Sequence, residues 1–447
     1  MKRMLLVTYH FPPDAAVGAV RPAKFAKYLP EFGWEPIVYT LKERYYETHD
    51  FGKLEPALNN TRIHRTALIA GPLRIYSGLK DRITKPRVDP DPAAPVIPMI
   101  RDGEPLERTP VRRLKGLTRS FFRLPDEEQG WILNVALEGY RIARRYKVDA
   151  FVTSAPPMST HIGGALLKKA TGIRWVADFR DPWVSSPLER IDPRDDFTRR
   201  LNERLESWVL RNADAVISTT ESLSAYFRTV VPHGQGDKCL TIPNGFDEDD
   251  FRSLEGFLPQ PGSKISMVFA GTIYLIRSPE PLFAALHALV STGQISDDRI
   301  EITLMGACIP YRGVTVQSLI EKYRLQGMVR VIDRVPYDVC IKAMANADVL
   351  LLFAQGQGDQ IPAKLFDYLR INRPIFAIAD DGETKRMLEP FANAFIADPC
   401  RIDDIQAKFL GLLKRISDGG KLLDDGANID RYSRRELARQ LSECLSR

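Results

Sequence analysis

Residues 4–40 read MLLVTYHFPPDAAVGAVRPAKFAKYLPEFGWEPIVYT and indicate the fold class of the chain. The apolar run from Met4 to Thr8 predicts a buried strand, and a loop then leads into a helix over Pro22 to Phe32. Gly33 follows that helix at the position where a left-handed glycine commonly ends one. Pro36 to Thr40 predicts a second strand. This order is typical of an open α/β sheet, whose ligands bind beyond the carboxyl ends of the strands.

The same alternation of strands and helices recurs in both halves of the chain. The first half has three further predicted strands and a helix, at 150–154, 174–178, 215–218 and 161–171. The second half has five predicted strands and an opening helix, at 265–270, 299–305, 329–332, 349–353, 375–379 and 282–291. Between the halves, LTIPNGFDEDDF (240–251) contains a Pro-Asn-Gly turn signal, where we place the linker. We therefore predict two similar α/β domains with a cleft between them.

The chain length also favours more than one domain, because 447 residues exceed what a single core usually holds. We predict a first domain over 1–243, a second over 244–430, and a C-terminal helix over 431–447 that packs back on the first domain. The region 72–130 is rich in proline and basic residues, including DPDPAAPVIP at 89–98. Such a composition resists a packed core, so we expect loops or an insertion there.

Composition places the protein among ordinary soluble globular proteins, with 44% hydrophobic and 27% charged residues. The five cysteines are scattered and lack CxxC spacing, which argues against a disulfide framework and fits a reducing cytoplasm. The N-terminal MKRMLLVTYH has no cleavage site of small residues, and no run approaches the roughly 20 apolar residues of a membrane span. The net charge of +6 permits contact with nucleic acid or with an anionic membrane surface.

A helix is predicted near the end of the second domain, in GDQIPAKLFDYLRINRP (358–374). Pro362 suits its first position, because the N–H that proline lacks would have had no partner there. The predicted buried face of this helix consists of Leu365, Tyr368, Leu369 and Ile371.

The polar residues of this segment indicate a ligand. Lys364 falls in the first helical turn, where a cation opposes the helix dipole, and this makes sense if an anion sits over the helix start. Asp359 and Asp367 flank that position and are able to bind hydroxyl groups. A phosphate with sugar hydroxyls on either side describes a nucleotide sugar. The alternative is an amphipathic helix with ordinary solvated acids.

Five motifs in order cover nearly the whole chain, namely FPPDAAVGAVR (11–21), TSAPPMSTHIGG (153–164) with VADFRDPW (176–183), IPNGFD (242–247), FAGTIY (269–274) and IPAKLFDYL (361–369). Together they resemble the GT-B glycosyltransferases of family 4, the retaining "glycosyl transferases group 1". The resemblance implies two Rossmann-like domains that face each other across a cleft. It also implies that the second domain binds a UDP- or GDP-linked sugar and that the first binds the acceptor.

The activity implied is that of a hexosyltransferase (EC 2.4) that acts on a saccharide or polyprenyl-linked acceptor. The implied setting is the assembly of bacterial surface polysaccharides or glycoconjugates, in the cytoplasm and at the inner face of the plasma membrane. The resemblance implies no cofactor and no metal. Asp89 to Asp91 superficially match a DxD metal motif, but their proline-rich surroundings favour a solvated loop.

For the donor site, the resemblance carries over residue by residue. Asp359 stands where the family contacts the donor sugar, and Asp367 where it binds the ribose, each as an aspartate in place of the usual glutamate. The backbone from Ile361 to Leu365 would cradle the diphosphate, and Arg334 lies where the family holds the base. The residues expected near the donor phosphates are Gly271, Arg277 and Lys364 in the second domain, with Gly18 and Arg21 from the first loop.

The catalytic region departs from the family. Where many members carry a histidine, this chain has Arg180, which is always charged and cannot act as a base. Arg180 could bind a phosphate or an acceptor carboxylate, or orient Asp181. His161 is a second candidate, with a helix-end hydrogen bonder as the alternative. Asp14 and Asp181 are candidates for orienting the acceptor hydroxyl, although Asp14 also fits a turn acid after two prolines.

The family resemblance suggests a retaining reaction in which the acceptor attacks from the front face. No protein nucleophile is evident in the sequence, so a donor phosphate oxygen would take the acceptor proton. The largest contribution expected of the protein is positive potential at the leaving diphosphate.

Residues 112–123 carry apolar and basic residues at helical spacing. Leu114, Leu117, Phe121 and Phe122 share one face, which suits the interface of a membrane. The alternative is a helix packed on its own domain with its charges in water.

Two other functions fit parts of the sequence, and two more are disfavoured. A GT-B sugar-nucleotide epimerase or hydrolase would use the same donor site, and a non-catalytic nucleotide-sugar-binding protein would explain the missing histidine. A nicotinamide-dependent enzyme is disfavoured, because FPPDAAVGAV is not GxGxxG. Nucleic-acid binding is remote, because the basic residues lack interleaved aromatic residues.

Overall fold

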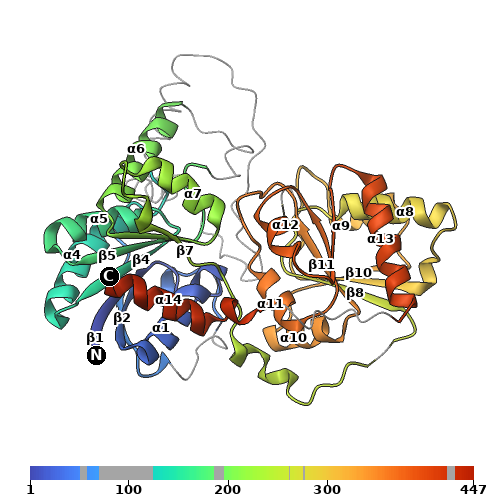
Figure 1. Cartoon of the computed structure of the whole chain (residues 1–447), viewed down its shortest axis with the longest axis horizontal. Coiled ribbons are helices and arrows are strands. Elements are labelled where there is room, and N and C mark those ends of the chain that lie inside the picture. The colour runs from blue at the N-terminus through green and yellow to red at the C-terminus, as the bar shows by residue number, and fades with distance from the viewer. Residues whose placement is uncertain (51–57, 70–123, 186–195, 261, 275–276, 420–427) are drawn as a thin grey trace, which may run out of the picture. The chain divides into compact units, whose positions relative to one another are not determined.

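The computed structural model describes residues 1–50, 58–69, 124–185, 196–260, 262–274, 277–419 and 428–447. The chain forms two compact units, shown in Figure 1. Unit 1 consists of Met1–Pro243 together with Leu437–Arg447, and unit 2 consists of Asn244–Glu436. Most of the predicted insertion over 72–130 lies outside the described residues. This part includes the Asp89–Asp91 motif and residues 112–123.

Among the described residues, unit 1 contains a parallel sheet in the order β3-β2-β1-β4-β5-β6-β7. Its strands are β1 (Lys2–Thr8), β2 (Trp34–Leu41), β3 (Arg62–Thr66), β4 (Ala150–Ala155), β5 (Arg174–Phe179), β6 (Ala215–Ser218) and β7 (Cys239–Thr241). Its helices are α1 (Val20–Tyr28), α4 (Gly130–Tyr146), α5 (Ser159–Thr171), α6 (Asp196–Asn212), α7 (Glu221–Val230) and the unit 1 part of α14 (Arg434–Ser446).

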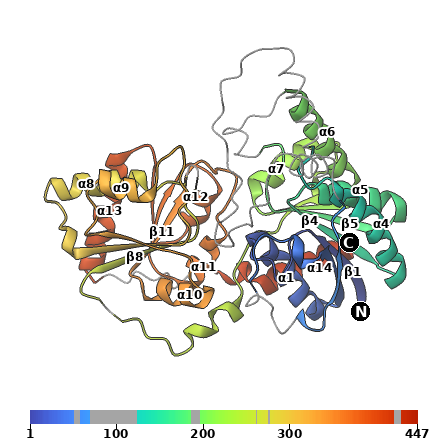
Figure 2. The ribbon, with the colours of Figure 1, turned by 180° about the vertical axis from the view of Figure 1, so that it is seen from behind.

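Helices cover both faces of this sheet because successive strand residues point to opposite sides. Leu5 and Val7 of β1 belong to one core cluster, which includes residues of α4, α5 and α6. Met4 and Leu6 belong to the other, which includes residues of α1 and of the C-terminal helix α14. The two ends of the unit 1 chain thus share a core, and α1 and α14 lie side by side in both views (Figures 1 and 2).

Unit 2 contains a second parallel sheet, with the described strands in the order β10-β9-β8-β11-β12-β13. These strands are β8 (Ile265–Ala270), β9 (Ile300–Met305), β10 (Val329–Ile332), β11 (Val349–Ala354), β12 (Ile375–Ala379) and β13 (Ala394–Ala397). The helices are α8 (Glu280–Ser291), α9 (Val316–Lys322), α10 (Tyr337–Asn346), α11 (Lys364–Ile371), α12 (Glu383–Leu388) and α13 (Ile402–Ser417). Residues of α8, α9 and α13 pack on one face of the sheet, and those of α10, α11 and α12 on the other.

The predicted α/β class and the two parallel sheets are confirmed, and several predicted strands agree to the residue, among them β6, β8, β10 and β12. Gly33 has the expected left-handed backbone, with φ of 83°. The predicted helix 22–32 is instead α1 followed by a 3-10 turn over Leu29–Phe32. Pro30 explains the change, because it has no N–H with which to continue an α-helical ladder.

The helix of the 358–374 segment also differs from its prediction. Helix α11 begins at Lys364, so Pro362 lies before the helix rather than at its first position. Phe366 is fully buried and was missing from the predicted apolar face, whereas Ile371 is only partly buried. Among the residues that the structure describes, no helix is long and apolar enough to cross a membrane.

Candidate functional site

The two central strands of unit 2, β8 and β11, are neighbours in the sheet, and their connections lead to opposite sides. The loop after β8 leads to β9, whereas the loop after β11 leads to β12 on the other side. Such a switch point is where open α/β sheets bind their ligands. Gly271 and Arg277 follow β8, and Lys364 follows β11 at the start of α11.

Lys364 is the most unusual charged residue of this switch point. Its Nζ lies 3.7 Å from the centre of the Phe269 ring and is buried, and it has no hydrogen-bond partner in the described part of the chain. Burial, and then the positive charge of Arg277, lower the pKa of Lys364 to about 7. A buried ammonium without a partner is unfavourable, so the site is suited to an anion.

The backbone around Lys364 is shaped to admit its ammonium group. Gly271 has φ of 128°, and a Cβ on this residue would lie 2.5 Å from the Lys364 Nζ. At the start of α11, the amide of Leu365 donates to the Pro362 carbonyl at 2.9 Å. The N–H of Leu365 is therefore used within the protein, and the prediction that it helps to cradle a diphosphate is wrong. The amide of Lys364 at the helix start has no acceptor among the described residues.

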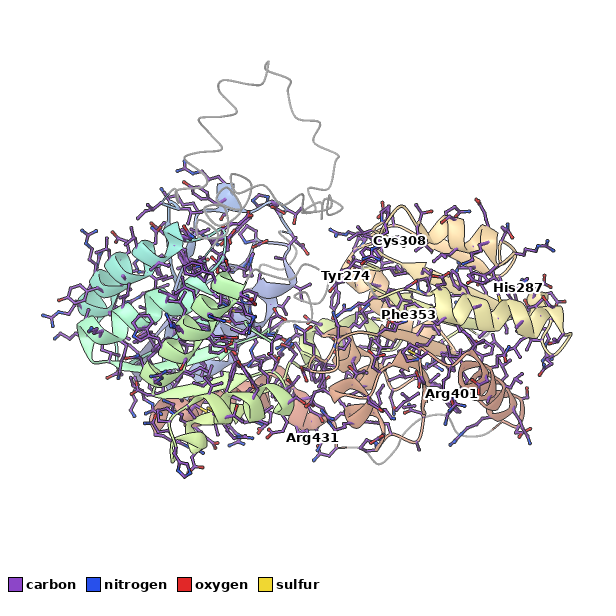
Figure 3. All side chains as sticks on the ribbon, turned by 90° about the horizontal axis from the view of Figure 1, so that it is seen from above. Tyr274, His287, Cys308, Phe353, Arg401 and Arg431 are labelled. Atoms are coloured by element: carbon purple, nitrogen blue, oxygen red, sulfur yellow. The ribbon has the colours of Figure 1, made fainter. Side chains whose placement is uncertain are left out.

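Arg277 is held close to this group by two contacts. Its Nε donates to the Oε1 of Gln357 at 3.1 Å, and its guanidinium lies 5.0 Å from the centre of the Tyr274 ring. Tyr274 is next to Ile273, which forms a β-bridge with Cys308, and Figure 3 shows Tyr274 and Cys308 at the same edge of unit 2. The structure thus brings together Gly271, Arg277 and Lys364, as the sequence predicts for phosphate-binding residues.

The two predicted carboxylates lie in different environments. Asp359 is exposed on the loop after β11, which is held by a 2.7 Å bond from the Glu383 amide to the Gly358 carbonyl. Asp367 is half-buried on α11, and its carboxylate accepts a hydrogen bond from the Tyr337 hydroxyl. Burial of that hydroxyl and the charge of Asp367 raise the pKa of Tyr337. Tyr337 therefore holds Asp367, a contact that the sequence did not indicate.

The remaining predicted donor residues lie at the periphery of this group. Arg334 is exposed after β10, at one edge of the sheet, and its amide donates to the Asp333 side chain at 2.7 Å. Ile361 is partly buried and packs on the core below α11. The assignment of Arg334 to the base and of Ile361 to the diphosphate stays a prediction.

In unit 1, the predicted role of Arg21 at a phosphate is wrong. Its side chain is only 2% exposed, and its Nε and Nη2 donate to the carboxylate of Asp178 at 3.0–3.1 Å. The remaining donors reach the carbonyl oxygens of Ile242 and Pro243 at 2.8 and 2.6 Å. Asp178 also accepts a bond from Ser154 at 2.8 Å. Arg21 thus joins α1 to β5 and to the chain after β7.

Arg180 is likewise a structural residue. Its Nε donates to the Ala155 carbonyl at 3.1 Å, and its other nitrogens donate to the carbonyls of Gly18 and Pro156. Burial lowers the pKa of Arg180, while the charge of Asp181 opposes that effect. A Cβ on Gly18 would lie 2.6 Å from the guanidinium, so Gly18 makes room for Arg180 rather than for a donor phosphate. Three loops at the carboxyl ends of β1, β4 and β5 are tied together by this one side chain.

His161 does not lie where a catalyst is needed. It is fully buried on α5, its Nδ1 pairs with the hydroxyl of Thr153 at 2.8 Å, and its ring lies 4.2 Å from that of Phe179. Burial lowers the pKa of His161 to about 3, so the ring is neutral throughout the physiological range. We therefore correct the prediction that His161 takes part in catalysis.

A cavity of about 480 Å³ opens at the carboxyl ends of the unit 1 strands. Asp14 lines it and is 3% exposed, whereas Asp181 is half-buried beside Arg180. The Asp14 carboxylate pairs with the Nδ1 of His10 at 2.6 Å, and His10 lines the same cavity. His10 was not among the predicted site residues. The available signal was a histidine four residues before Asp14 in the loop after the first strand.

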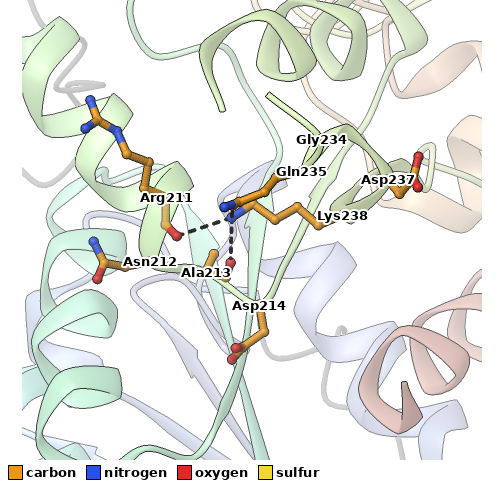
Figure 4. Close-up of a pocket in the computed structure, with 8 residues that line it drawn as sticks. All are labelled: Arg211, Asn212, Ala213, Asp214, Gly234, Gln235, Asp237 and Lys238. Atoms are coloured by element: carbon orange, nitrogen blue, oxygen red, sulfur yellow. Dashed lines mark hydrogen bonds between the residues drawn. The ribbon is translucent and has the colours of Figure 1, made fainter. Parts of the chain in front are cut away.

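A second cavity of about 440 Å³ lies at the opposite, amino-terminal edge of the same sheet, next to the starts of β6 and β7 (Figure 4). Lys238 donates to the carbonyls of Arg211 and Ala213 at 3.2 and 3.1 Å, and Asp214 pairs with Lys168 at 2.7 Å. Lys238 thus holds the end of α6 beside β7, and Lys168 of α5 is held by Asp214 before β6. The edge is also the wrong one for a ligand of an open α/β sheet. In the described residues, no group of three or more His, Cys, Asp or Glu is placed to hold a metal ion.

A family model described as a glycosyl transferase 4-like domain matches residues 18–245, more than half of the 447 residues. The chain belongs to this glycosyltransferase family. The family resemblance stated from the motifs is thereby confirmed. No curated protein sequence matches the chain.

Solved structures resemble this glycosyltransferase over its whole length. Sucrose-phosphate synthase from Thermosynechococcus elongatus is 16% identical with a TM-score of 0.59, over 100% of this chain and 94% of the other. HepE from Anabaena, in complex with UDP, is 14% identical with a TM-score of 0.62, over 100% of both chains. A UDP-N-acetylglucosamine 2-epimerase is 12% identical with a TM-score of 0.51, over 99% of this chain and 95% of the other. Identities this low show the fold alone, which is the predicted GT-B fold.

Proposed function

We propose that this glycosyltransferase moves a hexosyl group from a UDP- or GDP-linked sugar to a saccharide acceptor. The observation that carries the proposal is the buried, unpartnered ammonium of Lys364 at the switch point of unit 2. The donor diphosphate is the anion that suits it. Two cations, Lys364 and Arg277, would then stabilise the negative charge that the diphosphate gains as it leaves. No metal is needed for that charge.

The other residues of unit 2 are proposed to hold the donor on either side of the diphosphate. Asp367 would accept hydrogen bonds from the ribose hydroxyls, with Tyr337 fixing the position of its carboxylate. Asp359, exposed in its loop, would contact hydroxyls of the transferred sugar. Arg334 would lie near the base. Retention of the anomeric configuration and a role in surface polysaccharide assembly are further parts of this proposal, and the family resemblance supports them.

A panel of UDP-, GDP- and dTDP-sugars, with and without polyprenyl-linked saccharide acceptors, tests the proposal through release of nucleotide. We expect release that depends on the acceptor, and a product whose anomeric configuration matches the donor by NMR. Release that does not depend on the acceptor would favour a GT-B hydrolase or epimerase. Binding of a nucleotide sugar without any turnover would favour a non-catalytic binding protein.

The division of labour between the units gives a prediction about two aspartates. Asp367→Ala is expected to weaken binding of UDP or GDP by about 10-fold or more, because it removes a charged acceptor for the ribose hydroxyls. Asp181→Ala is expected to leave that binding unchanged and mainly to lower kcat. Calorimetric titration and initial rates measure the two effects, with the exposed Asp297→Ala as the control. The reverse pattern would show that the assigned roles are wrong.

The family resemblance also suggests a lipid-linked acceptor, and such an acceptor would make a contact with the membrane a further part of the proposed function. Residues 112–123 lie outside the described part of the structure, so the prediction rests on their sequence. Replacing Phe121 and Phe122 by serine is expected to reduce pelleting with anionic liposomes, because it removes the apolar edge of a basic helix. Serine replacements of two exposed apolar residues of α4, Leu133 and Leu137, are the control. Unchanged pelleting of the Phe121 and Phe122 variant would contradict the membrane contact.

A further inference from the structure

Two glutamines of the loop after β11 bind two neighbouring residues of the loop after β8. The Oε1 of Gln357 accepts hydrogen bonds from the Nε and the Nη2 of Arg277, the first at 3.1 Å. The Nε2 of Gln355 donates to the carbonyl of Ser278 at 2.8 Å. Both amide orientations follow from chemistry, because a guanidinium only donates and a carbonyl only accepts. The two loops on either side of the switch point are therefore joined by side chains.

The backbone on each side of Gln357 is fixed. The amide of Gly356 donates to the carboxylate of Asp380, and the carbonyl of Gly358 accepts a 2.7 Å bond from the amide of Glu383. Both partners follow β12, so the loop after β11 is fastened to the next loop of the sheet. Gln357 is itself buried. A buried side chain on a fastened loop holds its acceptor oxygen in one place.

Arg277 is also held by an aromatic ring. Its guanidinium lies 5.0 Å from the centre of the Tyr274 ring, and its amide donates to the Tyr274 carbonyl at 3.0 Å. A long arginine side chain loses conformational entropy when it is ordered. Because Gln357 and Tyr274 order this guanidinium in the folded protein, that cost does not fall on ligand binding.

The amide of Gln357 is neutral, so it orients Arg277 without cancelling its positive charge. A glutamate would accept the same two bonds, but its carboxylate would form an ion pair with the guanidinium. The charge of Arg277 acts at the switch point, since it adds to burial in lowering the pKa of Lys364, whereas Cys340 of α10 opposes these effects. A neutral acceptor at position 357 therefore preserves the positive potential that attracts an anion.

The stability of the fold alone does not explain the two glutamines. The Oε1 of Gln355 is buried and has no hydrogen-bond partner among the residues that the structure describes. A buried acceptor without a partner lowers the free energy of unfolding. The two buried amides are better explained by what they hold, which is Arg277 and the residue after it.

We propose that Gln357 is a positioning residue of the donor site, which holds the guanidinium of Arg277 ready for the diphosphate and leaves its charge in place. The inference rests on the proposed function and deepens it, because Gln357 acts through Arg277 rather than on the donor itself. Arg277 is able to bind Gln357 and a phosphate oxygen together, since a guanidinium carries several N–H donors in a fixed fork. Gln355 supports the arrangement through Ser278.

Gln357→Glu separates the charge of this acceptor from its shape. We expect the affinity for UDP or GDP to fall about 100-fold, because the carboxylate cancels the charge of Arg277 and repels a phosphate. The carboxylate also favours the protonated form of Lys364, so the pH above which affinity falls is expected to move upward from about 7. Calorimetric titration of the full chain over a range of pH measures both effects. Gln294→Glu, an exposed change before β9 at the opposite edge of the sheet, is the control.

A double-mutant cycle tests whether Gln357 acts through Arg277. Gln357→Met keeps most of the side-chain volume but removes the acceptor, and it is expected to lower the affinity about 10-fold. Arg277→Met is expected to lower the affinity at least as far. The two changes together should match Arg277→Met alone, because Gln357 then has no guanidinium to hold. Thermal unfolding of each variant shows whether it is folded.

A role of Gln357 in the fold alone predicts other results. Gln357→Glu would then bind nucleotide as the wild type does, or the effects of Gln357→Met and Arg277→Met would add in full. Either result would overturn the positioning role, while binding of nucleotide by the wild type would still support the donor site. If Gln357→Glu does not fold, the cycle alone decides. If the wild type binds neither UDP nor GDP, the proposed donor site fails, and this inference fails with it.

Discussion

Lys364→Met is expected to lower the affinity for UDP or GDP by about 100-fold while it stabilises the protein in the absence of nucleotide by about 1–3 kcal/mol below pH 7. The affinity falls because the buried ammonium is the proposed partner of the diphosphate. The stability rises because methionine fills the same space over the Phe269 ring without a charge. Calorimetric titration and thermal unfolding at one pH measure both effects.

The pKa of Lys364 also predicts how both quantities change with pH. In the folded protein without ligand this pKa is about 7, against the ordinary lysine value of 10.5 that applies to the unfolded chain. Between these values the unfolded state binds more protons, so the stability of the wild type rises with pH and the advantage of Lys364→Met shrinks. Nucleotide binding must take up a proton above pH 7, so the affinity is expected to fall by up to about tenfold per pH unit. Neither trend is expected in the variant.

The control for this prediction is Lys342→Met, which changes an exposed lysine on α10 of the same unit. Lys342→Met removes the same positive charge from an exposed position. Its affinity for nucleotide and its midpoint of thermal unfolding should therefore stay near those of the wild type. A Lys364→Met variant that binds nucleotide as tightly as the wild type would remove the main support for the donor site. A variant with lower stability would show that the ammonium has a partner in solution.

Arg21→Met is expected to destabilise the protein by about 3–5 kcal/mol, because it leaves the carboxylate of Asp178 buried without its cation. Asp178 is fully buried, and two backbone carbonyls after β7 lose their donor as well. For a unit of this size such a loss lowers the midpoint of thermal unfolding by about 10 °C. Scanning calorimetry measures the change.

Two further variants separate this effect from a general loss of charge. Arg21→Met combined with Asp178→Leu is expected to recover part of the stability, because no buried charge remains unpaired. Arg199→Met removes an arginine from an exposed pair with Glu203 in the same unit and should change the midpoint little. Equal midpoints for Arg21→Met and the wild type would contradict the structural role and reopen the phosphate-binding role that the sequence predicted for Arg21.

Most of the fold could be predicted from the sequence, because strand and helix signals are local. Alternating apolar runs and helices predicted two parallel α/β units, and the Pro-Asn-Gly signal placed the linker where unit 1 gives way to unit 2. Short elements were missed, among them the edge strands β3, β7 and β13. Edge strands are short and only partly buried, so their apolar signal is weak.

The sequence also predicted which residues of unit 2 lie together at its switch point. Lys364, Gly271 and Arg277 were named from their motifs, and the structure brings them together after β8 and β11. The predicted roles of residues in the first domain were less accurate. Arg21 was predicted to bind the donor, and Arg180 and His161 were predicted to be catalytic, yet all three are buried and bound to groups of the protein itself.

The sequence by itself determined the family, the two α/β units and the cation at the start of α11, because each depends on residues that are close together in the chain. Only the tertiary structure decided which polar residues face a cavity. Arg21 finds Asp178 at a separation of 157 residues, and no local pattern predicts that pairing. His10 lies only four residues from Asp14, but the cavity that both residues line is formed by residues from distant loops. Burial and pairing depend on the whole fold. They distinguish the buried, paired arginines Arg21 and Arg180 from Lys364, whose ammonium has no partner among the described residues.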